Sequence, residues 1–186
     1  MKPRTLALLA GAAAVGAALA ACSTMAQRSP APPLPHASAV DLPRYMGRWY
    51  VISSIPTFLE RGAVDATEHY TLRPDGSVDI DFHYRRSPGG SEQSLGSRGF
   101  VENGNNAIWG VQFIWPIRAD YRIAWLAPDY SRVVVAREKR DHVWIMARTP
   151  TLPQAEYDAM VQQVGAMGYD TAQLERVPQG AARNAP

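Results

Sequence analysis

The sequence has very little cysteine and no marked excess of charge of either sign. Its 186 residues include a single cysteine, Cys22, so no disulfide can form within the chain. Lys and Arg number 19 against 17 Asp and Glu, which gives a net charge of +2. A chain so close to neutral lacks the basic surface that binds nucleic acid. We therefore expect neither a disulfide framework nor a nucleic-acid partner.

Motifs that carry enzyme chemistry are also lacking. The sequence contains no G-x-S-x-G, no H-E-x-x-H and no glycine-rich phosphate-binding loop. These are the signatures of serine hydrolases, zinc proteases and nucleotide-binding enzymes. We therefore expect a protein without enzyme activity and without a cofactor.

The one long apolar run is too short to span a membrane comfortably. Residues 6–20 are mostly Ala, Leu, Val and Gly and follow Lys2 and Arg4, which is the pattern of a cleavable secretory signal. The run ends in Leu-Ala-Ala-Cys, which resembles the lipobox of bacterial lipoproteins. The resemblance implies cleavage before Cys22, acylation of that cysteine and a membrane anchor. Ser23 stands where Asp would mark retention in the inner membrane, so the outer membrane is implied, on its periplasmic face.

Proline separates the signal from the globular part. Four prolines and few large apolar residues lie between residues 23 and 40, a composition that cannot bury a core. We therefore divide the chain into a signal peptide (1–21), a lipidated cysteine with a Pro-rich tether (22–40), one globular domain (41–177) and a flexible tail (178–186).

Eight short runs of β-branched and aromatic residues follow one another within this domain. They span residues 49–55, 67–72, 78–84, 95–102, 107–115, 121–126, 132–138 and 143–147. Turn sequences such as Pro74-Asp75-Gly76 separate them, and short turns imply antiparallel neighbours. Eight such strands close most simply into a barrel. We predict an all-β fold, an eight-stranded antiparallel up-and-down β-barrel.

The period of the apolar residues becomes helical after residue 150. The apolar positions there are Tyr157, Met160, Val161, Val164 and Met167. Thr151 and Gln154 fit a capping box before them. One amphipathic α-helix is therefore predicted, packed with its apolar stripe against the outside of the barrel.

The candidate metal ligands lie on one face of the run 78–84. They are Asp79, Asp81 and His83. Because the opposite face of this run is apolar, the polar face is expected to be solvated and to hold no metal. The remaining candidates, His69 and His142, are expected at strand ends or in loops.

Three motifs in the correct order resemble those of the lipocalins. Gly47-Arg48-Trp49 opens the first predicted strand and resembles the first lipocalin motif, G-x-W. Pro128-Asp129-Tyr130-Ser131 resembles the second motif, and residues 144–150 resemble the third. Residues 58–62 and 168–170 are similar to the bacterial outer-membrane lipoprotein branch of the family in particular.

The resemblance implies how the barrel is closed and what it binds. Trp49 would plug one end, and Arg148 would stack across it and bind the backbone of the N-terminal turn. Gly47 would allow the close approach of that backbone because it has no Cβ. The cavity would then open at the other end and bind fatty acids, lysophospholipids or similar amphiphiles, for lipid storage or transport at the cell envelope.

The candidate ligand-binding residues share the inward parity of neighbouring strands. They are Phe82, Tyr84, Phe113, Trp115, Tyr121 and Trp125. An eight-stranded barrel is either filled by side chains or holds one small ligand, and Trp115 and Trp125 are large enough to fill it. Two alternatives therefore stay open: a structural or interaction lipoprotein with a filled barrel, and a lipid-modifying enzyme.

Overall fold

The computed structural model describes residues 32–102 and 104–180. The chain divides into two compact units, Met1–Pro32 and Pro33–Pro186, and every helix and strand described belongs to the second. The predicted signal peptide and Cys22 lie outside the described residues. Within the described ranges, no helix is both long enough and apolar enough to cross a membrane.

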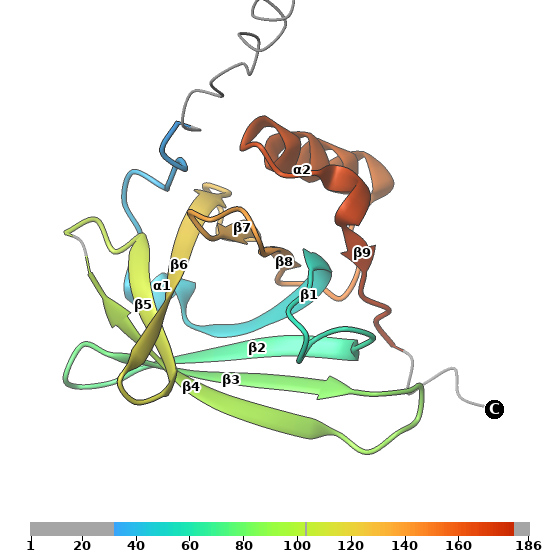
Figure 1. Ribbon diagram of the computed structural model, residues 1–186, viewed down its shortest axis with the longest axis horizontal. Coiled ribbons are helices and arrows are strands. Elements are labelled where there is room, and N and C mark those ends of the chain that lie inside the picture. The colour runs from blue at the N-terminus through green and yellow to red at the C-terminus, as the bar shows by residue number, and fades with distance from the viewer. Residues whose placement is uncertain (1–31, 103, 181–186) are drawn as a thin grey trace, which may run out of the picture. The chain divides into compact units, whose positions relative to one another are not determined.

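Eight antiparallel strands form a closed up-and-down barrel, which confirms the predicted fold (Figure 1). They are β1 (Gly47–Ile55), β2 (Val64–Leu72), β3 (Val78–Arg85), β4 (Gln93–Val101), β5 (Ile108–Ile114), β6 (Ile117–Leu126), β7 (Arg132–Ala136) and β8 (Val143–Ala147). Each strand pairs with the next along the chain, and β1 pairs with both β2 and β8. The pairings of β1 therefore close the barrel.

Helix α1 (Leu42–Tyr45) precedes the first strand, and helix α2 (Gln154–Ala166) follows the last strand of the barrel. The predicted capping box of α2 is wrong. The N-cap residue is Pro153, and no side chain caps the helix, because the Thr151 side chain lies two residues too early. The apolar stripe is as predicted, with Tyr157, Met160 and Val164 buried.

The barrel wall has an apolar core on each side. The inner core lies inside the barrel around Trp49, and the outer core lies between the wall and α2. Strand β7 shows the division, because Val133 and Val135 belong to the inner core and Val134 to the outer core. Alternate residues of a strand point to opposite faces, so a strand covered on both faces is apolar throughout.

The globular unit extends beyond both predicted boundaries. Leu34 and Val40 are buried, and the backbone N–H of Ala37 donates to the carbonyl of Ile123 at 2.8 Å. The tether assigned to residues 22–40 therefore overlaps the barrel unit. The high proline content of this segment indicated an extended tether, but Leu34 and Val40 within it pack on the barrel.

The C-terminal boundary of the globular unit also differs from the predicted one, because residues 175–179 complete the sheet. Only the first half of β1, from Gly47 to Tyr50, pairs with β2. Farther along, the two-residue strand β9 (Glu175–Arg176) pairs with Ser53 and Ser54 of β1. A ninth strand of two residues carries no alternation that a sequence pattern can reveal.

Hydrogen bonds after β9 bridge β1 and β2, and we call residues 175–179 the seam segment. The N–H of Val177 donates to the Ile52 carbonyl at 3.0 Å, and the Pro178 carbonyl accepts from the N–H of Asp65 at 2.8 Å. The Gln179 side chain donates to the carbonyls of Val51 at 2.7 Å and Ala66 at 3.0 Å. Residues 178 and 179, assigned to a flexible tail, therefore belong to the wall.

Candidate functional site

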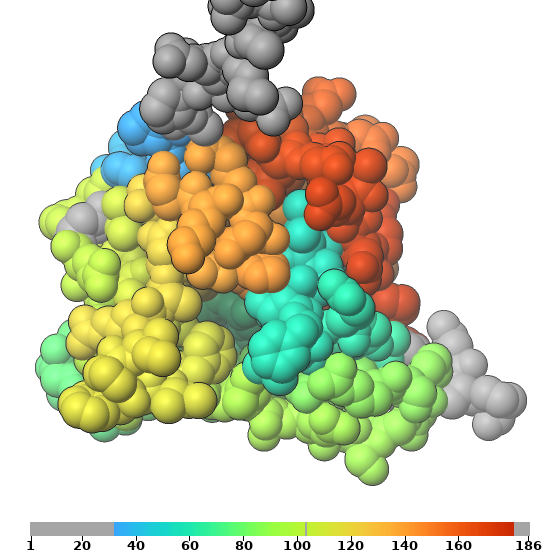
Figure 2. Space-filling view, viewed as in Figure 1, coloured from blue at the N-terminus to red at the C-terminus, as the bar shows by residue number. Residues whose placement is uncertain are grey.

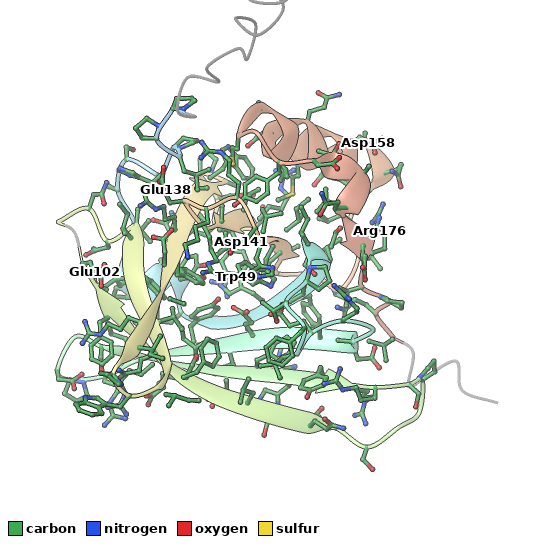
Figure 3. All side chains as sticks on the ribbon, viewed as in Figure 1. Trp49, Glu102, Glu138, Asp141, Asp158 and Arg176 are labelled. Carbon is green, nitrogen blue, oxygen red and sulfur yellow. The ribbon has the colours of Figure 1, made fainter. Side chains whose placement is uncertain are left out.

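Trp49 and Arg148 meet at one end of the barrel. The Trp49 side chain is fully buried, and the Arg148 guanidinium carbon lies 3.8 Å from its ring centroid. Figure 3 shows Trp49 inside the barrel. The Arg148 guanidinium donates to three backbone carbonyls of the N-terminal turn and β1, those of Arg48 at 2.8 Å, Arg44 at 3.0 Å and Tyr45 at 2.8 Å, and its Nε donates to the Tyr130 carbonyl at 3.4 Å. This cation therefore ties α1 and the start of β1 across the end of the barrel.

Gly47 is required for its backbone conformation. Its φ is +90°, a value that L side chains rarely adopt. A Cβ there would lie 3.6 Å from Nη1 of Arg148, which is an ordinary contact distance. The expected reason, close approach of the backbone, is therefore wrong, and the positive φ is what selects glycine.

An aromatic cluster forms the floor above this closure. Its rings are those of Tyr45, Trp49, Tyr70, Trp109 and Tyr121. Trp109 stacks on Tyr121 with a centroid distance of 5.1 Å, and Tyr45 meets Trp49 at 5.2 Å and Tyr70 at 5.3 Å. The floor is thus an aromatic layer whose polar groups are three hydroxyls and two indole N–H groups; the indoles of Trp49 and Trp109 donate to the carbonyls of Tyr45 at 2.9 Å and Asn106 at 2.7 Å.

The three tyrosine hydroxyls of the floor form one chain that ends at Glu68. Tyr45 Oη lies 2.9 Å from Tyr121 Oη, and Tyr121 Oη lies 2.7 Å from Tyr70 Oη. Tyr70 Oη donates to Oε2 of Glu68. Because an ionised carboxylate only accepts hydrogen bonds, Tyr70 is the donor to Glu68. Tyr121 then donates to Tyr70, and Tyr45 donates to Tyr121.

Glu68 occupies an inward position in the middle of β2. It lies opposite Trp49 on β1 and opposite Phe82 on β3. Burial raises the pKa of Glu68 from 4.5 to about 7, although the hydrogen bond from Tyr70 acts to lower it. Burial likewise holds the pKa values of Tyr70 and Tyr121 well above 10.

A cavity of about 270 Å³ opens above this floor. Its lining is mainly apolar and aromatic: Phe58, Leu59, Ile80, Phe82, Tyr84, Leu95, Val111, Phe113, Ala119, Tyr121 and Trp144, with the polar Thr57, Glu60, Glu68, Ser94, Ser97, Asp120 and Arg137. Figure 2 shows a hollow between the teal β1–β2 loop, the yellow β5–β6 hairpin and the orange β7–β8 loop. The barrel is therefore open at the end opposite Trp49.

Four of the six predicted ligand-binding residues line this cavity. Phe82 and Tyr84 stack on each other at 5.0 Å, Tyr121 lies at the floor, and Phe113 lies at the mouth with 53% of its surface exposed. The structure therefore brings these four side chains to one site. Their role in ligand binding stays a prediction.

The prediction for Trp125 is wrong. Between Ile123 and Trp125 the pairing of β6 with β7 shifts by one residue, so that Ile123 opposes Val135 and Trp125 opposes Val134. This β-bulge turns Trp125 to the other face of the wall. There it packs with the outer core beside α2.

The prediction for Trp115 is also wrong, because the residue lies in the turn between β5 and β6. Its side chain is 83% exposed and does not line the cavity. Neither Trp115 nor Trp125 fills the lumen. The filled-barrel interpretation that rested on these two indoles is therefore incorrect.

Two polar residues of the cavity, Glu68 and Glu60, were missed. The inward positions on β2 are Ala66, Glu68, Tyr70 and Leu72. One acidic residue among otherwise apolar or aromatic inward positions was the sequence feature that could have identified Glu68. Glu60 accepts from Trp144 Nε1 at 3.1 Å and from the N–H of Thr57 at 2.8 Å. No local sequence pattern could have revealed the contact between Glu60 and Trp144, which lie far apart in the sequence.

The candidate metal ligands of β3 face outward. Asp79 accepts from Arg73 at 2.7 Å and pairs with Arg98 at 3.2 Å, and His83 lies 3.4 Å from Glu92. Across residues 32–102 and 104–180, no group of three or more His, Cys, Asp or Glu side chains is arranged to hold a metal ion.

The chain matches the family described as the lipocalin-like domain over residues 40–179. It is 32% identical over 168 residues to outer membrane lipoprotein Blc of Escherichia coli K12, covering 89% of this chain and 95% of that protein. It is 31% identical over 156 residues to temperature-induced lipocalin-1 of Arabidopsis thaliana, covering 75% and 80%.

Among solved structures, insecticyanin of the tobacco hornworm Manduca sexta superposes with a TM-score of 0.62 at 13% identity, over 81% of this chain and 87% of that one. At this identity the likeness supports the fold alone. The relatives and the open apolar cavity together support the binding of small hydrophobic ligands. The chain therefore belongs to the lipocalin family, in the branch of the outer membrane lipoproteins Blc.

Proposed function

We propose that this lipocalin takes up fatty acids or lysophospholipids and stores or transports them at the cell envelope, held at the outer membrane by acyl chains on Cys22. The observation that carries the proposal is the apolar cavity of about 270 Å³ that opens at one end of the barrel. Typical small-molecule sites measure roughly 300–1,000 Å³. The cavity therefore suits one slender chain, with the rest of a larger ligand left at the mouth.

The lining supplies the free energy for binding an acyl chain. Phe82, Leu95 and Val111 cover three neighbouring strands of the wall. Burial of apolar ligand surface against such side chains contributes about 25 cal/mol per Å². The aromatic floor limits how deep the chain can enter.

A cation at the cavity supports binding of an acidic headgroup. Arg137 lines the cavity, and its Nε is buried without a hydrogen-bond partner among the described residues. Two other arginines, Arg118 of β6 and Arg61 of the β1–β2 loop, are placed differently. Arg118 lies over the Phe100 ring at 3.8 Å, and Arg61 does not line the cavity. Arg137 is therefore the residue proposed to meet a carboxylate or phosphate.

The exposed side chains at the mouth of the cavity support a role at a lipid surface. Six large apolar side chains of the β1–β2 loop and the β5–β6 hairpin are exposed: Phe58, Leu59, Phe113, Ile114, Trp115 and Ile117. Contiguous exposed apolar residues mark interaction surfaces, and Trp favours the membrane interface. A lipid leaving a membrane at this rim would enter the cavity with little exposure to water.

We also propose binding without catalysis. Three of the ionisable groups that line the cavity make structural contacts with the surrounding protein. Glu60 binds Trp144, Asp120 pairs with Arg122 at 3.0 Å, and Arg137 pairs with Asp141 at 3.4 Å. Groups fixed in this way orient the walls of the site.

Filling the cavity tests the proposal. Ser97 lines the cavity on β4, whereas Ser91 is exposed in the β3–β4 loop and does not. We expect Ser97→Trp to weaken uptake of a fluorescent fatty acid by the delipidated full chain by at least about tenfold, because the indole occupies the space of the acyl chain. The control Ser91→Trp should bind like the parent protein. Equal uptake by both variants, or no uptake by the parent, would contradict the proposal.

A further inference from the structure

Glu68 has an acceptor that its protein neighbours leave unused. Oε2 accepts from Tyr70, and no side chain or backbone group in residues 32–102 and 104–180 donates to Oε1. The carboxyl group lines the cavity directly above the aromatic floor. An apolar site thus presents one strong acceptor at its deep end.

The position of this acceptor is fixed. Glu68 lies in register between Trp49 and Phe82 on the neighbouring strands, and the hydroxyl chain from Tyr45 through Tyr121 to Tyr70 ends on its Oε2. Because each of these hydroxyls already donates its only proton, none can turn to serve Oε1. The donor for Oε1 must come from within the cavity.

The end of the ligand that reaches the floor therefore matters. A terminal methyl group would displace water from Oε1 and donate no hydrogen bond in its place. Burying a polar atom without a hydrogen bond costs free energy, so this orientation is unfavourable. A carboxylate would face a like charge. A primary ammonium or a hydroxyl group would restore the missing hydrogen bond, and the ammonium would also pair with the charge.

We propose that Glu68 makes the cavity selective for apolar molecules whose buried end carries a hydrogen-bond donor, a primary amine before a hydroxyl. The proposal rests on the proposed function, because it assigns the orientation and chemical class of ligand for the same cavity. A fatty acid can enter tail first with its carboxylate at Arg137, but its terminal methyl group then meets an unfavourable floor. An alkylamine of the same length enters amine first, and its tail points to the mouth.

The charge of Glu68 gives the selectivity a pH dependence. Its pKa of about 7 means that the carboxylate forms above neutral pH and is lost below it. The other titratable groups facing this space are Tyr45, Tyr70 and Tyr121 at the floor and Glu60, Asp120 and Arg137 higher in the cavity. Burial holds the pKa values of the three tyrosines above 10, so they stay neutral over this range. Lowering the pH should therefore weaken amine binding and leave alcohol binding nearly unchanged.

Three probes with eight carbon atoms each test the proposal by calorimetry on the full chain: n-octylamine, n-octanol and octanoate. At about pH 8 we expect the parent to bind octylamine at least about tenfold more tightly than octanoate, with octanol between them. Glu68→Gln should remove that preference while octanol binding changes less than about threefold. The amide oxygen of Gln still accepts from Tyr70, so the hydroxyl chain is kept.

A control variant and a pH series locate the effect. Glu175→Gln removes the same charge from the exposed strand β9 and should keep the amine preference. In the parent, octylamine affinity should fall about tenfold between about pH 8 and pH 5.5. This measurement needs no variant and is independent of any folding defect.

The inference is overturned if octanoate binds as tightly as octylamine, or if Glu175→Gln abolishes the preference as Glu68→Gln does. It is also overturned if Glu60→Gln, and not Glu68→Gln, abolishes the preference, since the amine would then bind at the mouth. Tight binding of octanoate with weak binding of octylamine leaves the proposed function intact and removes only this inference. Failure of all three probes to bind removes both.

Discussion

Among single residues, Arg148 makes the largest number of connections at the closed end. One guanidinium donates to the carbonyls of Arg44, Tyr45 and Arg48 and stacks on Trp49. Its partial burial acts to lower the pKa of Arg148, but a guanidinium stays charged. Only a planar group with several donors can meet three carbonyls and an aromatic face together.

Arg148→Lys should therefore destabilise the protein although the charge is kept. We expect a loss of about 2 kcal/mol in the free energy of unfolding, because an ammonium cannot serve the three carbonyls and stack at once. Urea unfolding followed by fluorescence measures it. Arg176→Lys is the matched control, since Arg176 also lies over a ring, that of Tyr157, on the α2 side of the molecule (Figure 3). It is more exposed and should cost less than about 1 kcal/mol; equal losses in the two variants would contradict the assignment.

The residues of the closed end were accessible from sequence because motifs carry them. Trp49 and Arg148 stand in segments that resemble the first and third lipocalin motifs, and the structure brings the two side chains together. Glu68 stands in no motif. Strand parity assigns it to the inner face, but parity does not say that its partner is Tyr70 or that one oxygen faces a cavity.

At the scale of elements, seven of the eight predicted strands overlap the observed ones with small shifts at their ends, and the eighth matches in full. The alternation of inward and outward residues gave a wrong assignment where a strand contains a bulge. Trp125 has the parity of Tyr121, yet the irregularity after Ile123 places it on the outer face. One extra residue reverses every later assignment on a strand, and the local sequence gives no mark of it.

The seam segment supplies a prediction at the same scale. Gln179 donates to the carbonyls of Val51 and Ala66 and so connects β1 to β2 where these strands do not pair. Gln179→Ala should lower the free energy of unfolding by about 1–2 kcal/mol, because two carbonyls lose their donor. Hydrogen exchange should also show faster exchange near the seam.

Gln173→Ala provides the comparison for this experiment. The Gln173 side chain donates only to the nearby Asp170 at 3.0 Å and is exposed. Such a surface change should stay within about 0.5 kcal/mol of the parent. If Gln179→Ala were equally mild, the seam segment would not hold the wall.

For the molecule as a whole, composition and strand count were enough to predict the barrel, and the helical period was enough to predict α2. The cavity could not be derived in the same way. Whether an eight-stranded barrel is open depends on which large side chains point inward, and two of the five tryptophans, Trp115 and Trp125, point elsewhere. Their exclusion from the lumen leaves space that the sequence pattern assigned to them.

Attachment to a membrane is the prediction that concerns the whole protein. Cys22→Ala should yield protein that is not processed at the lipobox and does not stay on membranes after carbonate washing, because acyl chains provide the durable attachment. Fractionation followed by mass spectrometry of the N-terminus measures both effects. Ser23→Ala keeps the cysteine and should remain attached. Processed and firmly attached Cys22→Ala protein would contradict the role of the cysteine.

The seam segment also bears on how this barrel folds, because its contacts join distant parts of the chain. Gln179 contacts Val51 across a sequence separation of 128 residues. The part of the barrel wall formed by β1 and β2 is therefore complete only after the seam segment has joined it. Contacts between such distant residues form slowly, because the entropy of closing the loop is lost before the contact forms. During that interval β1 and β2 present unpaired strand edges, the kind of surface that joins neighbouring chains. We therefore expect the chain to be most prone to association with its neighbours in the time between formation of the first and the last strand.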